Sequence, residues 1–189
     1  MSTADPGPGW TEAHPADAAP GYVHVYTGDG KGKTTAAFGL ALRAAGHGKR
    51  VFVGQFMKGQ PDGEIAALAE SPLVDVEQFG TPGCIRMHEV SEGHVGCARE
   101  GLDRARHALR EGDYDVVVLD EIDIAIWFGL LTVSHALRLI DERPPRTELV
   151  LTGRRAPCEI IERADLVTEM REVKHYYRQG VLARAGIEF

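Results

Sequence analysis

The chain has 189 residues, of which 43% are apolar and 26% charged, the size and composition of one ordinary globular domain. Lysine and arginine number 21 and aspartate and glutamate number 28, which gives a formal charge of −7. This charge argues against a protein that binds nucleic acid or an anionic membrane surface, although a local basic cluster can still bind a small anion.

The cysteines and the apolar segments predict a cytoplasmic protein with reduced thiols. Cys84, Cys97 and Cys158 are an odd number, and no basic N-terminal region precedes an apolar run as it does in a signal peptide. The most apolar stretch, 122–133, is too short to span a bilayer and contains Asp123.

The chain divides into a short tail and one domain. Residues 1–20 contain four of the ten prolines, with alanine, glycine and aspartate between them. A segment of this composition buries too little apolar surface to offset the entropy of ordering it. We therefore predict a flexible tail over residues 1–21 and a single domain over residues 22–189.

After the tail, short apolar runs alternate with longer amphipathic segments. In chain order they are strand 22–26, helix 34–45, strand 50–56, helix 63–70, strand 74–79, helix 95–111, strand 115–119, helix 132–140, strand 148–151, helix 157–163 and strand 166–169. This alternation predicts an α/β fold, in which a mostly parallel sheet of about six strands is covered by helices on both faces.

A glycine-rich sequence, TGDGKGKTT at residues 27–35, lies between the first predicted strand and the first predicted helix. Glycines allow backbone N–H groups to curl around phosphate oxygens, and the helix N-terminus adds the positive end of its dipole. In such a loop Lys33 supplies a charge for the terminal phosphates, and the Thr34 hydroxyl is placed for Mg²⁺. The nucleotide-binding residues predicted from this loop are Gly28, Asp29, Gly30, Lys31, Gly32, Lys33, Thr34 and Thr35.

The spacing of this loop departs from the usual G-x-x-x-x-G-K-[ST] pattern. Thr27 stands five residues before Gly32, and the first glycine, Gly28, stands only four before it. A glycine-rich turn in another role is the alternative, but the flanking strand and helix favour phosphate binding. The domain is therefore predicted to be P-loop NTPase-like.

A second motif, DVVVLDE at residues 115–121, is an apolar strand that ends in Asp120 and Glu121. Beside a phosphate loop, such a strand typically brings a carboxylate to Mg²⁺. Without a neighbouring loop, the final aspartate could simply cap the next segment. Beside the loop it predicts that Thr34, Asp120 and Glu121 surround Mg²⁺. The sequence has no N-K-x-D element for guanine, and it gives no clear cue for a general base.

Several further motifs follow the loop in order: FG at 38–39, RAAGHGK at 43–49, QFMKG at 55–59, VVLDE at 117–121, ERP at 142–144, TGR at 152–154, VKH at 173–175 and GIEF at 186–189. Together with the shortened loop, they resemble the P-loop type of ATP:corrinoid adenosyltransferase, from about residue 22 to the C-terminus. The shortened loop with these later motifs is specific to that family, whereas a phosphate loop alone would not be.

This resemblance implies an unusual use of ATP. The reduced corrinoid, as Co(I), attacks the C5′ carbon of ATP, inorganic triphosphate leaves, and the nucleophile carries no proton for a base to remove. Lys33, Thr34 and Glu121 would then stabilise the leaving triphosphate with Mg²⁺. Arg43, Arg154 and Lys174 would be further nucleotide contacts, or else surface cations.

The resemblance also suggests partners and leaves other functions open. It implies a homodimer, and a reductase as electron donor. One alternative function is a P-loop kinase or hydrolase that acts on the γ-phosphate, and another is a non-catalytic ATP or corrinoid sensor or carrier.

The segment after the third strand, FGTPGCIRMH at residues 79–88, departs from the family pattern. Members of the family carry a Phe-x-Trp pair there that helps to remove the lower axial ligand of cobalt, and this segment has no tryptophan. An apolar wall could come from Phe79, Ile85 or Met87, or from the pair 127–128 on another loop.

Four potential metal ligands, Cys84, His88, His94 and Cys97, lie within the same region. Their spacing fits none of the common zinc modules. A metal site and a contact with the corrinoid are both possible interpretations, but an ordinary loop is the favoured one.

Overall fold

The computed structural model describes residues 20–60, 63–83 and 85–188. The tail predicted for residues 1–21 lies almost wholly outside these described residues, so the boundary at residue 21 stays a prediction. Within the described residues, no helix combines the length and the apolar character that crossing a membrane requires.

A single parallel sheet forms the centre of the domain, with strand order β3-β2-β4-β5-β1-β6. The strands are β1 (Val23–Thr27), β2 (Val51–Phe56), β3 (Val74–Phe79), β4 (Val116–Asp120), β5 (Glu148–Thr152) and β6 (Leu166–Glu169). The predicted six-stranded parallel sheet is thus confirmed. The central strands β2 and β4 are buried along their whole length, as parallel strands covered on both faces require.

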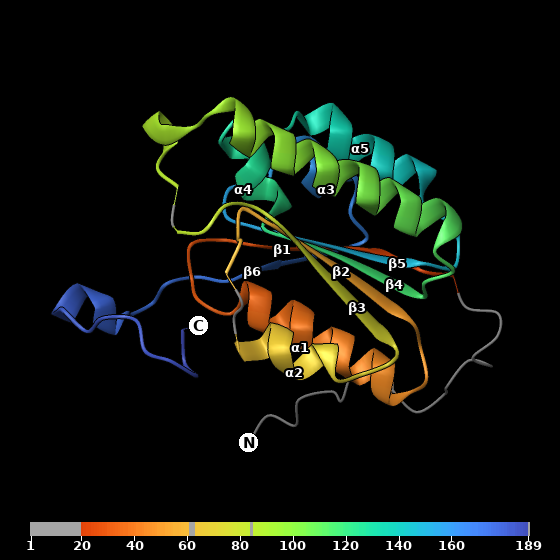
Figure 1. The fold of residues 1–189 in the computed structure, drawn as a ribbon, viewed down its shortest axis with the longest axis horizontal. Coiled ribbons are helices and arrows are strands. Elements are labelled where there is room, and N and C mark those ends of the chain that lie inside the picture. Colours follow the sequence, from red (N-terminus) through yellow and green to blue (C-terminus); the bar gives the residue numbers. More distant parts are fainter. Residues whose placement is uncertain (1–19, 61–62, 84, 189) are drawn as a thin grey trace, which may run out of the picture.

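Helices cover both faces of this sheet, also as predicted (Figure 1). On one face lie α1 (Lys33–Gly46) and α2 (Gly63–Ala69). On the other lie α3 (Glu92–Glu111), α4 (Ile122–Trp127), α5 (Val133–Glu142) and α6 (Cys158–Arg163). The sequence did not predict α4, because a six-residue apolar run is too short to show a helical period.

The helix α3 begins three residues earlier than the predicted range 95–111. Ser91 and His94 form a capping box at its N-terminus, in which the His94 ring nitrogen accepts a hydrogen bond from the Ser91 backbone N–H at 3.0 Å. A capping box of this kind satisfies N–H groups that have no partner in the first turn of a helix. The structural role of His94 is therefore to start α3.

The packing of α3 on the sheet depends on Gly101, because a Cβ there would lie 2.7 Å from atoms of both Phe56 and Phe79. We expect Gly101→Ala to lower the free energy of unfolding by about 1–3 kcal/mol through overpacking. Gly96→Ala is the matched control, since a Cβ at Gly96 on the same helix meets open space. It should raise the stability by roughly 0.5–1 kcal/mol. Urea unfolding of both variants measures the difference, and equal stabilities would contradict this account.

Because all strands run in the same direction, their carboxyl ends meet at one edge of the sheet. Thr27, Asp120 and Thr152 end the neighbouring strands β1, β4 and β5 there. The glycine-rich loop connects β1 to α1 at the same edge, and the candidate site is built around it.

Candidate nucleotide-binding site

The loop between β1 and α1 has the tight backbone of a phosphate-binding loop. Gly28 and Gly32 have φ angles of 94° and 121°, in the region that favours glycine. The backbone at Gly28 also passes so close to the chain beyond β6 that a Cβ would lie 2.5 Å from the carbonyl oxygen of Met170. A side chain is therefore excluded at Gly28, where the loop turns.

The Lys33 side chain lies inside the curl of this loop. Its ammonium donates hydrogen bonds of 2.7 Å to the carbonyl oxygens of Gly28 and Gly30, and the residue is only 6% exposed. Burial lowers the pKa of Lys33, while the negative charge of Glu121 acts in the opposite direction. The result is a cation that the protein has already placed in the loop and largely stripped of water.

Asp120 joins the loop to the sheet, because its buried carboxylate accepts hydrogen bonds from three side chains. The Thr34 hydroxyl donates to it at 3.3 Å, the Gln55 amide at 3.0 Å and the Thr152 hydroxyl at 2.7 Å. Thr152 also accepts from the backbone N–H of Glu121 at 3.0 Å. The sheet thus fixes the carboxylate beside the loop hydroxyl.

Gln55 and Thr152 contact Asp120, although the sequence predicted no role for either residue. Gln55 is the direct neighbour of Asp120 across β2 and β4, and Thr152 ends the next strand, β5. Both belong to segments that carry the family resemblance, QFMKG at 55–59 and TGR at 152–154. Those segments were the available signal, but only the register of the strands reveals the contact.

Glu121 has an unusual backbone and an unusual protonation equilibrium. Its φ of 60° is left-handed, and its carboxylate lies at the edge of the cavity described below. Burial, and then the charge of Asp120, raise the pKa of Glu121 to about 6, although Lys33 and Lys58 act in the opposite direction. A cation bound beside Glu121 and the neighbouring Asp120 would offset this charge.

A cavity of about 890 Å³ opens over the loop. Its polar lining comes from the loop itself and from Lys58, Glu121 and Arg154. Its apolar lining comes from the facing sides of α1 and α2, and the segment 186–188 closes a further side. The cavity therefore offers cations for phosphate groups and, beside them, apolar surface for a nucleoside.

Most of the predicted site residues meet at this cavity. Its lining includes Asp29, Gly30, Lys31, Gly32, Lys33, Thr34, Thr35, Glu121 and Arg154. Gly28 and Asp120 do not line the cavity but contact residues that do, because Gly28 accepts a hydrogen bond from Lys33 and Asp120 accepts one from Thr34. Arg43 and Lys174 are exposed and do not line the cavity, whereas their sequence neighbours Leu42 and His175 do.

The apolar wall expected near residue 79 is not supplied by Phe79. This side chain is only 6% exposed and packs on Phe56 in the core, with ring centroids 5.8 Å apart. The exposed candidates are Met87 and Trp127, and the guanidinium of Arg155 lies over the Trp127 ring at 4.4 Å. The prediction for Phe79 is therefore wrong, because its β3 position faces α3.

The metal site that was one alternative for the same segment does not form among the residues that the structure describes. His94 contacts Ser91 and the Thr81 hydroxyl instead, and His88 lies near Glu89. Cys84 lies outside the described residues. His94 and Cys97 lie on α3 and not in a loop, and the interpretation of the four residues together stays a prediction.

Proteins with similar sequences identify the family of this chain. The model of the family described as ATP:corrinoid adenosyltransferase BtuR/CobO/CobP matches residues 19–189. The corrinoid adenosyltransferase of Escherichia coli K12 is 39% identical over 170 residues, which cover 89% of this chain and 86% of the relative. A corrinoid adenosyltransferase from a Sinorhizobium species is 40% identical over 172 residues, with 89% and 80% of the two chains covered.

A third relative, the corrinoid adenosyltransferase CobA of Salmonella typhimurium LT2, is 37% identical over 89% of this chain and 86% of its own. The matched region contains the phosphate loop, the strand that ends in Asp120 and the whole cavity. The chain therefore belongs to the ATP:corrinoid adenosyltransferase family and transfers the adenosyl group of ATP to a corrinoid.

Proposed function

We propose that a corrinoid reduced to Co(I) attacks the C5′ carbon of ATP, and that inorganic triphosphate is the leaving group bound by the glycine-rich loop. The observation that carries this proposal is the meeting of Lys33, Thr34 and Glu121 at one cavity in a chain of this family. The acceptor is the corrinoid substrate, so the protein has to position two bound molecules and stabilise the charge that leaves.

The loop residues stabilise the leaving triphosphate. The C5′–O bond breaks with its electron pair on oxygen, so negative charge grows on the triphosphate as the cobalt–carbon bond forms. Lys33 and the backbone N–H groups of the loop are fixed before the reaction, and donors placed in advance are the most effective stabilisers of such charge. Arg154, on the same cavity, adds a further cation.

The residues around Thr34 fit Mg²⁺. Hydroxyl and carboxylate oxygens are the ligands that this ion prefers, and the Thr34 hydroxyl already lies within hydrogen-bonding distance of Asp120. Thr34 would be a direct ligand of Mg²⁺, and Asp120 and Glu121 would bind the ion either directly or through water. When bound, the ion would neutralise charge on the triphosphate oxygens. Gln55 and Thr152 orient the Asp120 carboxylate for this role.

The corrinoid mechanism explains why the site offers cations for an anion and no clear general base. A kinase or hydrolase has to orient a hydroxyl or a water and accept its proton, whereas Co(I) carries no proton. The family match does not favour these alternatives, nor a carrier without turnover. We further propose a cytoplasmic homodimer, and a separate reductase that supplies the electron for reduction of the corrinoid to Co(I). Light scattering would test the dimer, and pull-down with candidate reductases would test the partner.

Single-turnover incubation with MgATP and chemically reduced cob(I)alamin tests the reaction. We expect a light-sensitive cobalt–carbon bond together with one equivalent of triphosphate. ADP and phosphate without that bond would overturn the proposed chemistry and support a kinase or hydrolase. Binding of both ligands without any product would support a carrier.

The role of Thr34 predicts a change in metal dependence. Thr34→Val keeps the shape of the side chain but removes its hydroxyl, so the Mg²⁺ concentration for half-maximal rate should rise by about 10-fold or more. Steady-state rates over a magnesium titration measure this, with adenosine binding as the control that should stay unchanged. An unaltered magnesium curve would contradict the assignment of Thr34 as a metal ligand.

A further inference from the structure

The chain beyond β6 returns to the phosphate loop. The backbone N–H of Met170 donates to Thr27 at 2.8 Å, and the N–H of Gly30 donates to the Met170 carbonyl at 2.6 Å. The chain then forms a short 3₁₀ helix, η2 (Tyr176–Gln179), and turns at Gly180, whose φ is 84°. Figure 1 shows this C-terminal segment in blue, beside the loop and outside the two helical layers.

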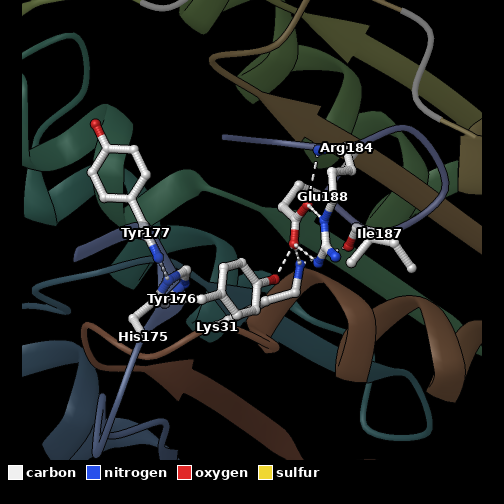
Figure 2. Close-up of polar contacts among 7 residues, drawn as sticks. All are labelled: Lys31, His175, Tyr176, Tyr177, Arg184, Ile187 and Glu188. Carbon is white, nitrogen blue, oxygen red and sulfur yellow. Dashed lines mark hydrogen bonds and ion pairs between the residues drawn. The ribbon is translucent and has the colours of Figure 1, made fainter. Parts of the chain in front are cut away.

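Glu188 lies at the centre of a polar cluster at the end of this segment (Figure 2). Its carboxylate accepts a hydrogen bond from the Tyr176 hydroxyl. It also accepts hydrogen bonds from the backbone N–H of Arg184 at 2.8 Å and from the guanidinium of Arg184 at 3.3 and 3.4 Å. The guanidinium lies over the Tyr176 ring, 4.9 Å from its centroid. Several donors therefore fix this carboxylate in one place.

The cluster reaches the phosphate loop through Lys31. The Lys31 ammonium donates a hydrogen bond of 2.7 Å to the Ile187 carbonyl and lies 3.8 Å from the Glu188 carboxylate. Lys31, Ile187 and Glu188 all line the cavity over the loop. A side chain of the loop is thus held by residues that follow it by more than 150 positions.

The two loop lysines at the cavity are fixed in different ways. Lys33 is buried and bonds to carbonyls within its own loop, whereas the Lys31 side chain is 43% exposed. A free lysine side chain carries rotamer entropy that binding would have to remove. Contacts from the C-terminal segment restrict Lys31 before any nucleotide arrives. An ammonium has three donors, so Lys31 keeps donors for a phosphate oxygen.

We propose that Glu188 is a positioning residue, which together with the Ile187 carbonyl holds the Lys31 ammonium at the cavity, and that Tyr176 and Arg184 hold Glu188 for this purpose. The proposal rests on the assignment of the loop as the triphosphate site. Arg184 and Lys31 offset the charge of Glu188, so its carboxylate does not repel the triphosphate strongly. The C-terminal segment then sets the affinity for the triphosphate part of ATP, in the ground state and the transition state alike.

The test is a double-mutant cycle of Glu188→Ala and Lys31→Ala in the full chain. We expect Glu188→Ala to raise KM for ATP about 10-fold and to leave kcat within about twofold of the wild-type value. This result indicates the loss of an interaction that is equally strong in the ground state and the transition state. Binding of inorganic tripolyphosphate, measured by calorimetry, should weaken by the same factor, while binding of adenosine stays unchanged. In the Lys31→Ala background, Glu188→Ala should then have less than about a twofold effect.

Two further variants separate positioning from folding. Glu188→Gln keeps an acceptor for Tyr176 and Arg184 but loses the charge, so an intermediate loss of about threefold in tripolyphosphate affinity is expected. Arg178→Ala, in the same segment, removes a cation that pairs with Glu172 instead, and should leave the affinity unchanged. If Glu188→Ala does not fold, Glu188→Gln can be combined with wild-type Lys31 and with Lys31→Ala to give the same double-mutant cycle.

The outcomes distinguish this proposal from the proposed function. Additive effects of the two substitutions, an equal loss of adenosine binding, or tighter tripolyphosphate binding in Glu188→Ala would each overturn the role of Glu188. Tighter binding would show that the carboxylate repels the ligand. Wild-type protein that forms no cobalt–carbon bond would instead overturn the proposed reaction, whatever the result of the cycle.

Discussion

Replacing Lys33 with methionine is expected to lower kcat/KM for ATP by about 100- to 1,000-fold, the usual cost of losing one fixed donor to developing charge. Methionine keeps the length of the side chain and removes its charge. The loss should appear mainly in kcat, because the negative charge on the triphosphate increases as the C5′–O bond breaks. Steady-state rates of adenosylcorrinoid formation at saturating corrinoid measure the effect.

The control has to account for the hydrogen bonds of Lys33 to Gly28 and Gly30, which also hold the loop. Thermal unfolding of Lys33→Met shows whether the fold survives, and affinity for adenosine shows whether the cavity does. Lys49→Met is the matched variant, since Lys49 is half-exposed and pairs with Asp115 at the opposite edge of the sheet. A loss of less than about fivefold in Lys33→Met would contradict a role in leaving-group stabilisation.

The sequence predicted the sheet and the loop because both have local signals. The strands are β-branched runs between turn residues, and the glycines of the loop lie next to the lysine and threonine that complete it. The site contacts that were missed depend on strand register or on distant parts of the chain. Gln55 meets Asp120 only because β2 pairs with β4, and Lys31 meets Glu188 across 156 intervening residues.

Arg43 illustrates a limit of placing residues by distance along a helix. It lies on α1 beyond the loop, near enough along the axis to suggest a nucleotide contact. Successive residues of a helix are rotated by about 100°, so Arg43 faces away from its neighbour Leu42, which lines the cavity. The charge of Arg43 instead acts on Tyr26 of β1. The direction of a side chain, and not only its position along the axis, decides which residue lines the cavity, and a nucleotide contact of Arg43 stays a prediction.

Asp123 is the second residue for which a large effect is expected, in stability and not in rate. It lies in the first turn of α4, fully buried, and neither carboxylate oxygen has a hydrogen-bond partner. The backbone of Gly153 packs against it, where a Cβ would lie 2.6 Å from the Asp123 Cβ. Burial, and then the charge of Glu121, raise the pKa of Asp123 from 3.8 to about 7. The carboxyl is therefore costly to ionise in the folded protein.

The raised pKa fixes the sign of the pH dependence. Between pH 3.8 and about pH 7 the folded protein keeps a proton on Asp123 that the unfolded chain has lost. The stabilising contribution of the protonated carboxyl is complete below pH 3.8 and is lost as the pH rises through about 7. Each unit of the shift corresponds to about 1.36 kcal/mol, so roughly 4 kcal/mol of unfolding free energy is lost over this interval.

Asp123→Asn should remove this loss, because an amide does not ionise. At pH 8 we expect the variant to be more stable than the wild type by about 4 kcal/mol, which corresponds to roughly 8–16 °C in Tm. Near pH 4 the two proteins should be about equally stable, since both side chains are then neutral and lack partners. Urea unfolding of both proteins from pH 4 to pH 8 measures the difference.

Asp113→Asn is the matched control for this series. Asp113 is exposed and left-handed, with a φ of 50° that asparagine also tolerates, so its substitution should change the stability only slightly. A stability difference for Asp123→Asn that stays constant from pH 4 to pH 8 would show that Asp123 is ionised throughout. In that case its carboxylate has a compensating partner in solution, such as a bound water or cation beside Glu121.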